Sequence, residues 1–389
     1  MRRDILSGRK IIFLFGFLHA ALNAIYLSRT GFGTGYETVA IARSLAATGR
    51  FADPYAALAT GLTAHATPLY PAFLALVFRL FHSADAVTFA VTFANAVAFG
   101  TLLALLPALS LRIWGTPSSG TVAAWAFICA PVFRVDAQFE SIFLAAALAS
   151  CCLSFMAPGR AWAPGLLAGV AILLNPAAIP LLCVWGAGML WMGFISPRST
   201  FIVAAVALML CAPWSLRNHA KIGTLSLRDN FPLELQVYNN DLARPSFTGS
   251  LASREMFHPN ENLQQAELVR SLGERDYEKR KWTQAADWIR SHPKRFLVLC
   301  AQRYFLFWLP GWDERPFAPA VWIVTALSLP AFVYAVRSRS GIAVLLAGAA
   351  IAYSLVYALV GAEFRYCEPI LWISILFAAH TALQIFRIR

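Results

Sequence analysis

The chain has 389 residues, of which 59% are hydrophobic and only 13% are charged. A soluble globular domain carries roughly 25% charged residues, so this composition excludes a soluble enzyme and a disordered protein. The net charge of +12 does not require a nucleic-acid partner, because a membrane protein retains Lys and Arg on its cytoplasmic side. We therefore expect an all-α polytopic membrane protein with no nucleic acid bound.

Ten apolar runs are long enough to be predicted as membrane-spanning helices. They cover residues 11–27, 86–110, 120–134, 139–156, 162–175, 176–195, 200–214, 318–336, 341–360 and 369–386. The fifth and sixth runs form one stretch that is broken at Asn175-Pro176, where the proline removes a backbone donor and favours a turn. We count two spans there, and a single kinked, tilted helix is the alternative.

The basic residues orient these spans. With the N-terminus inside the cell, the inner segments hold eleven basic residues and one acidic residue, Asp4. This orientation requires the aromatic segment 296–317 to lie on the outer surface without crossing the membrane. We expect one domain, 1–389, with both termini cytoplasmic and two large outer segments, 28–85 and 215–317.

The first outer loop, 28–85, is predicted to carry surface helices. Apolar residues repeat at helical spacing across 36–48, and Gly49 is a favourable residue to end that helix. Glu37 falls in its first turn, where the helix dipole favours a carboxylate. A second helix is expected over 68–81, opened by a proline and too short to span the membrane.

Short motifs spread along nearly the whole chain resemble those of one known family. In chain order they are an acidic residue before Ile41-Ala42-Arg43-Ser44-Leu45, then Pro68-Leu69-Tyr70-Pro71, Pro213-Trp214-Ser215-Leu216-Arg217-Asn218, Arg228-Asp229-Asn230-Phe231 through Glu234 and Asn239, the segment 274–308, and Phe364-Arg365-Tyr366 with Pro369. Their order resembles the GT-C membrane glycosyltransferases, more narrowly the bacterial glycosyltransferase family 39 and RgtA/B/C/D-like group. The resemblance implies an inverting enzyme of the bacterial inner membrane. It would move a sugar from polyprenyl phosphate to an acceptor on the outer face.

The resemblance also implies a catalytic carboxylate in the first outer loop. Many relatives place an Asp a few residues before Glu37, and this chain has Thr34 at that position. Glu37 is the nearest carboxylate, so we predict that it is the base that accepts the proton of the acceptor hydroxyl.

The leaving phosphate needs cations, and arginine binds phosphate oxygens with two parallel hydrogen bonds. Arg217 and Arg365 are the first candidates, because both lie in motifs at outer ends of spans, and Arg303 is a further one. A snorkelling arginine is the alternative for each. The other predicted substrate contacts are His65, Tyr70, Tyr366 and Asp53. We predict no cofactor and no metal.

Two other functions stay open. A lipid-carrier transporter or flippase would need a continuous polar cavity through the helices, and the sequence shows none. A proton- or ion-coupled transporter is disfavoured, because almost no ionisable residue lies in the middle of any apolar run. A catalytically inactive GT-C-like protein is the third possibility, because of Thr34. The sequence identifies neither the sugar nor the acceptor, which would be an envelope glycan, a lipid or a protein.

Overall fold

The computed structural model describes residues 2–27, 36–129, 139–157, 159–311 and 318–386, and in these ranges the chain is helical with two isolated β-bridges. The elements are α1 (Arg2–Leu27), α2 (Glu37–Thr48), α3 (Leu69–Leu80), α4 (Ala84–Trp114), α5 (Ser118–Cys129), α6 (Ser141–Phe155), α7 (Trp162–Leu174), α8 (Ala178–Trp191), α9 (Pro197–Ile222), α10 (Phe231–Tyr238), η2 (Thr248–Ser250), α11 (Leu251–Phe257), α12 (Leu263–Leu272), α13 (Glu274–Ser291), α14 (Pro293–Trp308), α15 (Ala318–Arg337), α16 (Gly341–Val360), η3 (Phe364–Tyr366) and α17 (Glu368–Ile385). The all-α expectation is confirmed.

Five of the described helices, α4, α9, α15, α16 and α17, are long and apolar enough to cross a membrane. Helices α5, α6, α7 and α8 are also apolar but have only 12 to 15 residues. At 1.5 Å per residue, helices of this length reach about 18–22 Å, less than the ~30 Å hydrocarbon core. The helices are those of a helical membrane protein, but length alone does not establish ten spans.

The apolar stretch around Asn175 forms two helices and not one kinked helix. Helix α7 ends at Leu174 and α8 begins at Ala178. The Asn175 side chain accepts a hydrogen bond from the Ala177 N–H at 3.1 Å, which closes the turn between them. The helix therefore breaks at Asn175-Pro176, where the proline predicted a turn.

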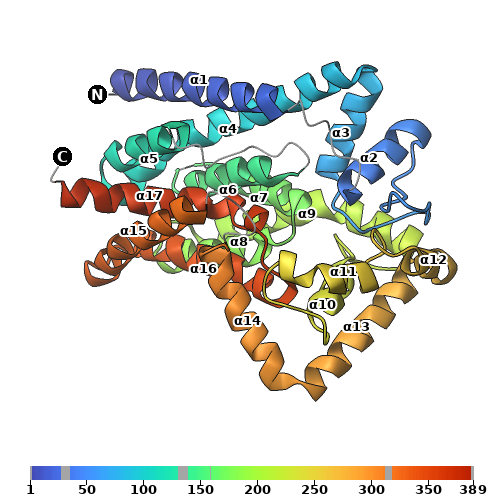
Figure 1. The fold of residues 1–389 in the computed structure, drawn as a ribbon. Coiled ribbons are helices and arrows are strands. Elements are labelled where there is room, and N and C mark those ends of the chain that lie inside the picture. The colour runs from blue at the N-terminus through green and yellow to red at the C-terminus, as the bar shows by residue number, and fades with distance from the viewer. Residues whose placement is uncertain (1, 28–35, 130–138, 158, 312–317, 387–389) are drawn as a thin grey trace.

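The long helices pack side by side in one bundle. Helix α17 is the most deeply enclosed, between α5, α6 and α15, and α4 packs against α1, α5 and α6. The α1–α4 contact depends on Gly100, where an added Cβ would lie 2.8 Å from the Phe13 carbonyl oxygen. The start of α1 and the end of α17 lie at the same end of the bundle (Figure 1).

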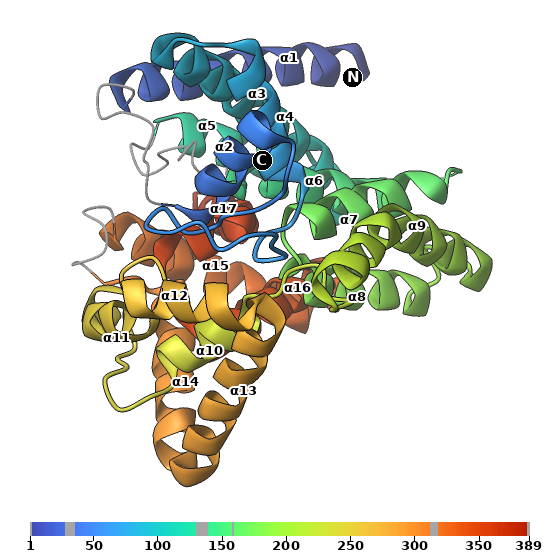
Figure 2. The ribbon, with the colours of Figure 1, turned by 90° about the vertical axis from the view of Figure 1, so that its right-hand side faces the viewer.

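The opposite end of the bundle carries α2, the first outer loop and α10 to α13 (Figure 2). The two helices expected in this segment are present as α2 and α3, and Gly49 ends α2 with a left-handed φ of 74°. A small separate core packs the first loop against α10, α12 and α13: Tyr55, Leu233, Val237, Tyr238, Val269 and Tyr277. Helices α13 and α14 form a V that projects from the bundle (Figure 1).

Candidate functional site

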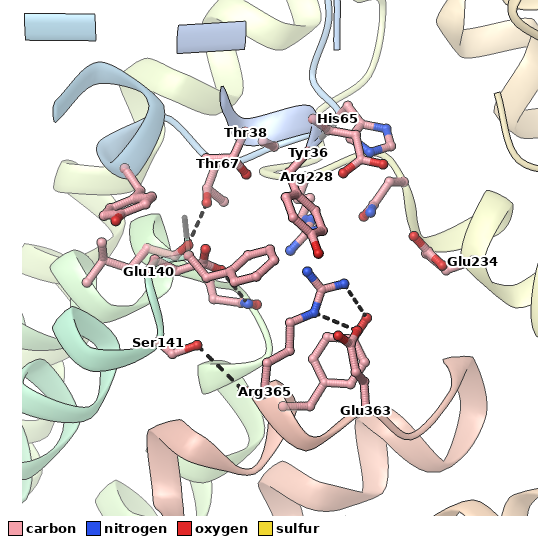
Figure 3. Close-up of a pocket in the computed structure, with 18 of the residues that line it drawn as sticks. Tyr36, Thr38, His65, Thr67, Glu140, Ser141, Arg228, Glu234, Glu363 and Arg365 are labelled. Carbon is pink, nitrogen blue, oxygen red and sulfur yellow. Dashed lines mark hydrogen bonds and ion pairs between the residues drawn. The ribbon is translucent and has the colours of Figure 1, made fainter. Parts of the chain in front are cut away.

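A polar cavity of about 360 Å³ lies where the first outer loop and the α10–α11 segment meet the ends of α6, α7 and α16. It brings together five of the eight residues predicted to form the site, although they are far apart in the sequence. These are Glu37, His65, Tyr70, Arg365 and Tyr366. Figure 3 shows His65 and Arg365 projecting into this space from opposite walls.

Glu37 enters the cavity from the N-terminus of α2, as the helical pattern of the first loop predicted. Its side chain is 21% exposed, so the carboxylate reaches solvent within the cavity. Asn260 donates a hydrogen bond to Glu37 Oε1 at 2.6 Å and fixes one of its two oxygens. The other oxygen is available to a substrate hydroxyl. Thr34, the position of the family's Asp, lies outside the described residues.

His65 and Tyr70 form part of the wall beside Glu37. His65 is buried, and its Nδ1 is 3.3 Å from the Tyr55 hydroxyl. Burial, and then the nearby charge of Arg228, lower the pKa of His65 to about 3, so the ring is neutral at physiological pH. Tyr70 packs against Phe73 and Phe143, with ring centroids 5.8 and 5.6 Å away.

Arg365 projects from η3 into the centre of the cavity (Figure 3). Its Nε is 2.7 Å from Glu363 Oε2, and its guanidinium lies 4.2 Å from the Phe139 ring centroid. Burial alone would lower the pKa of Arg365, but Glu363 and Tyr366 more than reverse this and raise it above its usual value. Arg365 is therefore a permanent cation, and it is paired with the carboxylate of Glu363.

Arg217 and Asp53 do not line the cavity. Arg217 donates to the backbone carbonyls of Thr63 and Phe51, at 2.6 and 3.0 Å, and ties the first outer loop to α9. Asp53, at a left-handed φ of 58°, accepts hydrogen bonds from the Gly61 N–H and the Ser44 hydroxyl. Their contacts are those of residues that shape the loop.

Arg303 is also outside the cavity. It is fully buried and donates to the Tyr238 carbonyl, to the Asn239 side chain and to the Leu359 carbonyl. These contacts join the end of α10 to the end of α16. An arginine whose donors already bind protein carbonyls has little left for a phosphate.

Arg228 lines the cavity and was not among the predicted residues. Its Nε is buried without a hydrogen-bond partner, and its guanidinium forms no ion pair among the described residues. The neighbouring backbone is fixed, because Asp229 N donates to the Ala64 carbonyl at 2.8 Å and Asn218 donates to the Ser226 carbonyl at 2.8 Å. Arg228 is thus a positioned cation with free donors.

A second, mainly apolar groove of about 470 Å³ adjoins the cavity between α8, α10 and α16. Ile179, Phe231, Val356 and Val360 contribute its apolar lining. The two spaces share Asn175, Arg228, Asn230, Glu234, Tyr357 and Tyr366. A ligand with an anionic centre and an apolar tail would fit with its charge at Arg228 and its tail in the groove.

Acidic residues outnumber basic ones in the described lining of the cavity: Glu37, Glu140, Glu234, Glu261 and Glu363 face Arg228, Arg254 and Arg365. Carboxylates accept hydrogen bonds from sugar hydroxyls, so this lining suits a polyhydroxylated group. Glu234 belongs to the motif that begins at Arg228, but the sequence patterns assigned it no role in the site, and Arg254 lies on a short helix without a distinctive motif.

Helix α13 anchors two segments that carry residues of the cavity lining. Glu274 accepts hydrogen bonds from the Ala64 N–H at 2.6 Å and from the Thr63 hydroxyl, and Glu278 accepts from the Leu233 N–H at 2.9 Å. Burial is the main cause that raises the pKa of Glu274 to about 7. Two carboxyls on one helix thereby attach both the first outer loop and α10.

In the part of the chain that the structure describes, no group of three His, Cys, Asp or Glu side chains is arranged to hold a metal ion. Comparison of the chain with protein-family models, with curated proteins and with solved structures finds no match. The function is therefore inferred from the chemistry of the site.

Proposed function

We propose that this protein is a membrane glycosyltransferase that moves a sugar from a polyprenyl-phosphate donor to an acceptor hydroxyl with inversion. The observation that carries the proposal is the junction at Arg228: a cation with free donors stands between a polar cavity and an apolar groove. A lipid-linked phosphosugar has the same three parts in the same order.

In this mechanism the sugar and the acceptor hydroxyl occupy the polar cavity. Glu37 takes the proton of the hydroxyl as the oxygen attacks the anomeric carbon from the face opposite the phosphate. The bond to the phosphate breaks, and the negative charge that grows on its oxygens is stabilised by Arg228, with Arg365 beside it. Phosphate leaves as a stable anion, so no acid is needed.

We further infer that α1, α4 to α9 and α15 to α17 are ten spans of a bacterial inner-membrane protein, with both termini cytoplasmic. The proposal is supported by the correspondence between these helices and the ten apolar runs. It is also supported by the position of α2, whose Glu37 lines the cavity, at the end of the bundle opposite the start of α1 and the end of α17 (Figure 1). The active site would then face the outside.

The test is a transfer assay with the protein in proteoliposomes. Donors are a panel of polyprenyl-phosphate hexoses and pentoses, and membranes from a strain that lacks the protein supply the acceptor. Glu37→Gln should lower kcat by about 10²–10⁴-fold, the usual contribution of a general base. Glu267→Gln, an exposed carboxylate on α12, should leave kcat unchanged. Full turnover by Glu37→Gln would show that Glu37 is not the base. Donor movement across the bilayer without transfer would favour a flippase.

A further inference from the structure

His258 lies directly behind Glu37 and has no role in the steps above. It follows the last residue of α11, and its side chain is fully buried. Its Nε2 is 3.6 Å from Glu37 Oε1 and 3.9 Å from Glu234 Oε1, and this atom has no hydrogen-bond partner among the described residues. A buried polar atom without a partner is costly, so its position between two carboxylates calls for an explanation.

The backbone fixes which nitrogen of His258 carries the proton. The Asn260 N–H donates to Nδ1 at 3.2 Å, so Nδ1 must present its lone pair. A neutral ring then carries its proton on Nε2, the atom that faces Glu37 and Glu234. Burial, and then the surrounding cations, lower the pKa of His258 well below its usual value, so the ring stays neutral at physiological pH. The titratable groups around it are Glu37, Tyr55, His65, Glu234, Arg254, Glu261, Lys281 and Arg365.

Glu37 is the better acceptor of the two carboxylates that face Nε2. Its Oε1 is the nearer, and Asn260 already holds that oxygen at 2.6 Å. Burial raises the pKa of Glu234, which lowers its share of the ionised form that accepts hydrogen bonds best. Residues 258 and 260 thus converge on one oxygen of Glu37 and leave the other oxygen toward the cavity.

We propose that His258 is a positioning residue: when substrate fills the cavity, its Nε2–H closes onto Glu37 Oε1 and holds that carboxylate ionised, with its second oxygen toward the acceptor. This rests on the proposed role of Glu37 as the base. The closure shortens a 3.6 Å separation, as catalytic hydrogen bonds commonly tighten on substrate binding. His258 itself gains and loses no proton.

Two substitutions of His258 separate this role from a merely structural one. The amide of Gln reaches the position of Nε2, whereas the amide of Asn reaches only that of Nδ1. A donor to an ionised carboxylate lowers its pKa, so its loss in His258→Asn should move the acid limb of kcat/KM up by about one pH unit. It should also lower kcat/KM by about ten- to a hundredfold. His258→Gln should keep the limb in place and recover most of the rate.

A second measurement does not depend on transfer. The infrared carboxyl band that titrates in the wild-type protein and is missing in Glu37→Gln belongs to Glu37. Its midpoint in lipid nanodiscs should rise in His258→Asn and stay near the wild-type value in His258→Gln. Equal midpoints in all three proteins, or equal rate losses in both variants with an unmoved limb, would overturn the inference. Absence of transfer by the wild type would instead count against the proposed function, and the infrared titration would still decide whether His258 acts on Glu37.

Discussion

The polar cavity and the apolar groove are neighbours, yet opposite chemistry lines them. The cavity is walled by five carboxylates and three arginines of the described chain, whereas the groove is lined mainly by Ile179, Phe231, Val356 and Val360. Neither alone indicates a lipid-linked substrate, because sugar sites are common in soluble enzymes and apolar grooves are common in membranes. Their shared boundary at Arg228 is what supports the proposal of such a substrate, since it offers one place for an anion between a hydrated group and a hydrocarbon tail.

Removal of the cation at the boundary should have the largest effect on transfer from the lipid-linked donor. Arg228→Gln should lower kcat/KM for the lipid-linked donor by about 10²–10³-fold, the usual effect of deleting one group that stabilises transition-state charge. Arg228→Lys should recover part of this, because an ammonium keeps the charge but not the paired donors.

Arg290→Gln is the matched control for Arg228. The Arg290 side chain is 76% exposed on α13, and among the described residues it pairs only with the exposed Asp287, so its loss should change neither kinetics nor stability. If Arg228→Gln and Arg290→Gln have the same donor kinetics, Arg228 does not bind the donor phosphate. The cavity and the groove would then not share one ligand.

The arginines also show how far the sequence could lead. The sequence selected Arg365 because it lies in a motif directly before an apolar helix, and the structure places it in the lining of the cavity. The same reasoning also selected Arg217 and Arg303, whose donors turn out to bind backbone carbonyls. Whether a guanidinium is satisfied by carbonyls from distant segments depends on the tertiary fold, and no local pattern records it.

The fold was more predictable than the site for a physical reason. Apolar runs and their breaks are local, so each of the ten runs corresponds to a helix, and the break at Asn175 separates α7 from α8. Arg228 and His258 lie in irregular polar segments without periodicity, and their partners are set by contacts across the chain. A basic residue within the Arg228-Asp229-Asn230-Phe231 motif was the one signal that could have pointed to Arg228.

Filling the groove tests whether it holds the lipid of the donor. Val356→Trp places a large ring in the groove, and kcat/KM for a long-chain polyprenyl donor should fall about tenfold, the equivalent of about 1.4 kcal/mol of lost apolar contact. A donor with a two-isoprene lipid should react nearly as before. Leu355→Trp, at the adjacent position of α16, is 54% exposed outside the groove and should leave both donors unaffected. Equal losses with long and short donors would show that the groove does not hold the lipid.

The smallest expected effect concerns stability. It should change how firmly the loop beside the cavity is held, and it should leave the groove unchanged. Burial disfavours the charged form of Glu274 and raises its pKa from the usual 4.5 to about 7 in the folded protein. Below 4.5 both the folded and the unfolded states hold this proton, so the stabilisation is complete. As the pH rises, the unfolded state releases the proton first, and the stabilisation is lost as the pH passes 7.

The melting temperature of the wild type should therefore fall by a few degrees between about pH 5 and pH 8, relative to Glu274→Gln, which cannot ionise. Glu267→Gln, on the exposed face of α12, should follow the wild type. Glu274 accepts hydrogen bonds from Thr63 and Ala64, which directly precede His65 of the cavity wall, and it does not line the groove, so binding of a long-chain lipid should keep its affinity over the same range. A wild-type melting curve that does not depend on pH relative to Glu274→Gln would mean that the loop is held without this carboxyl. The attachment of the loop beside the cavity would then be as independent of pH as lipid binding in the groove.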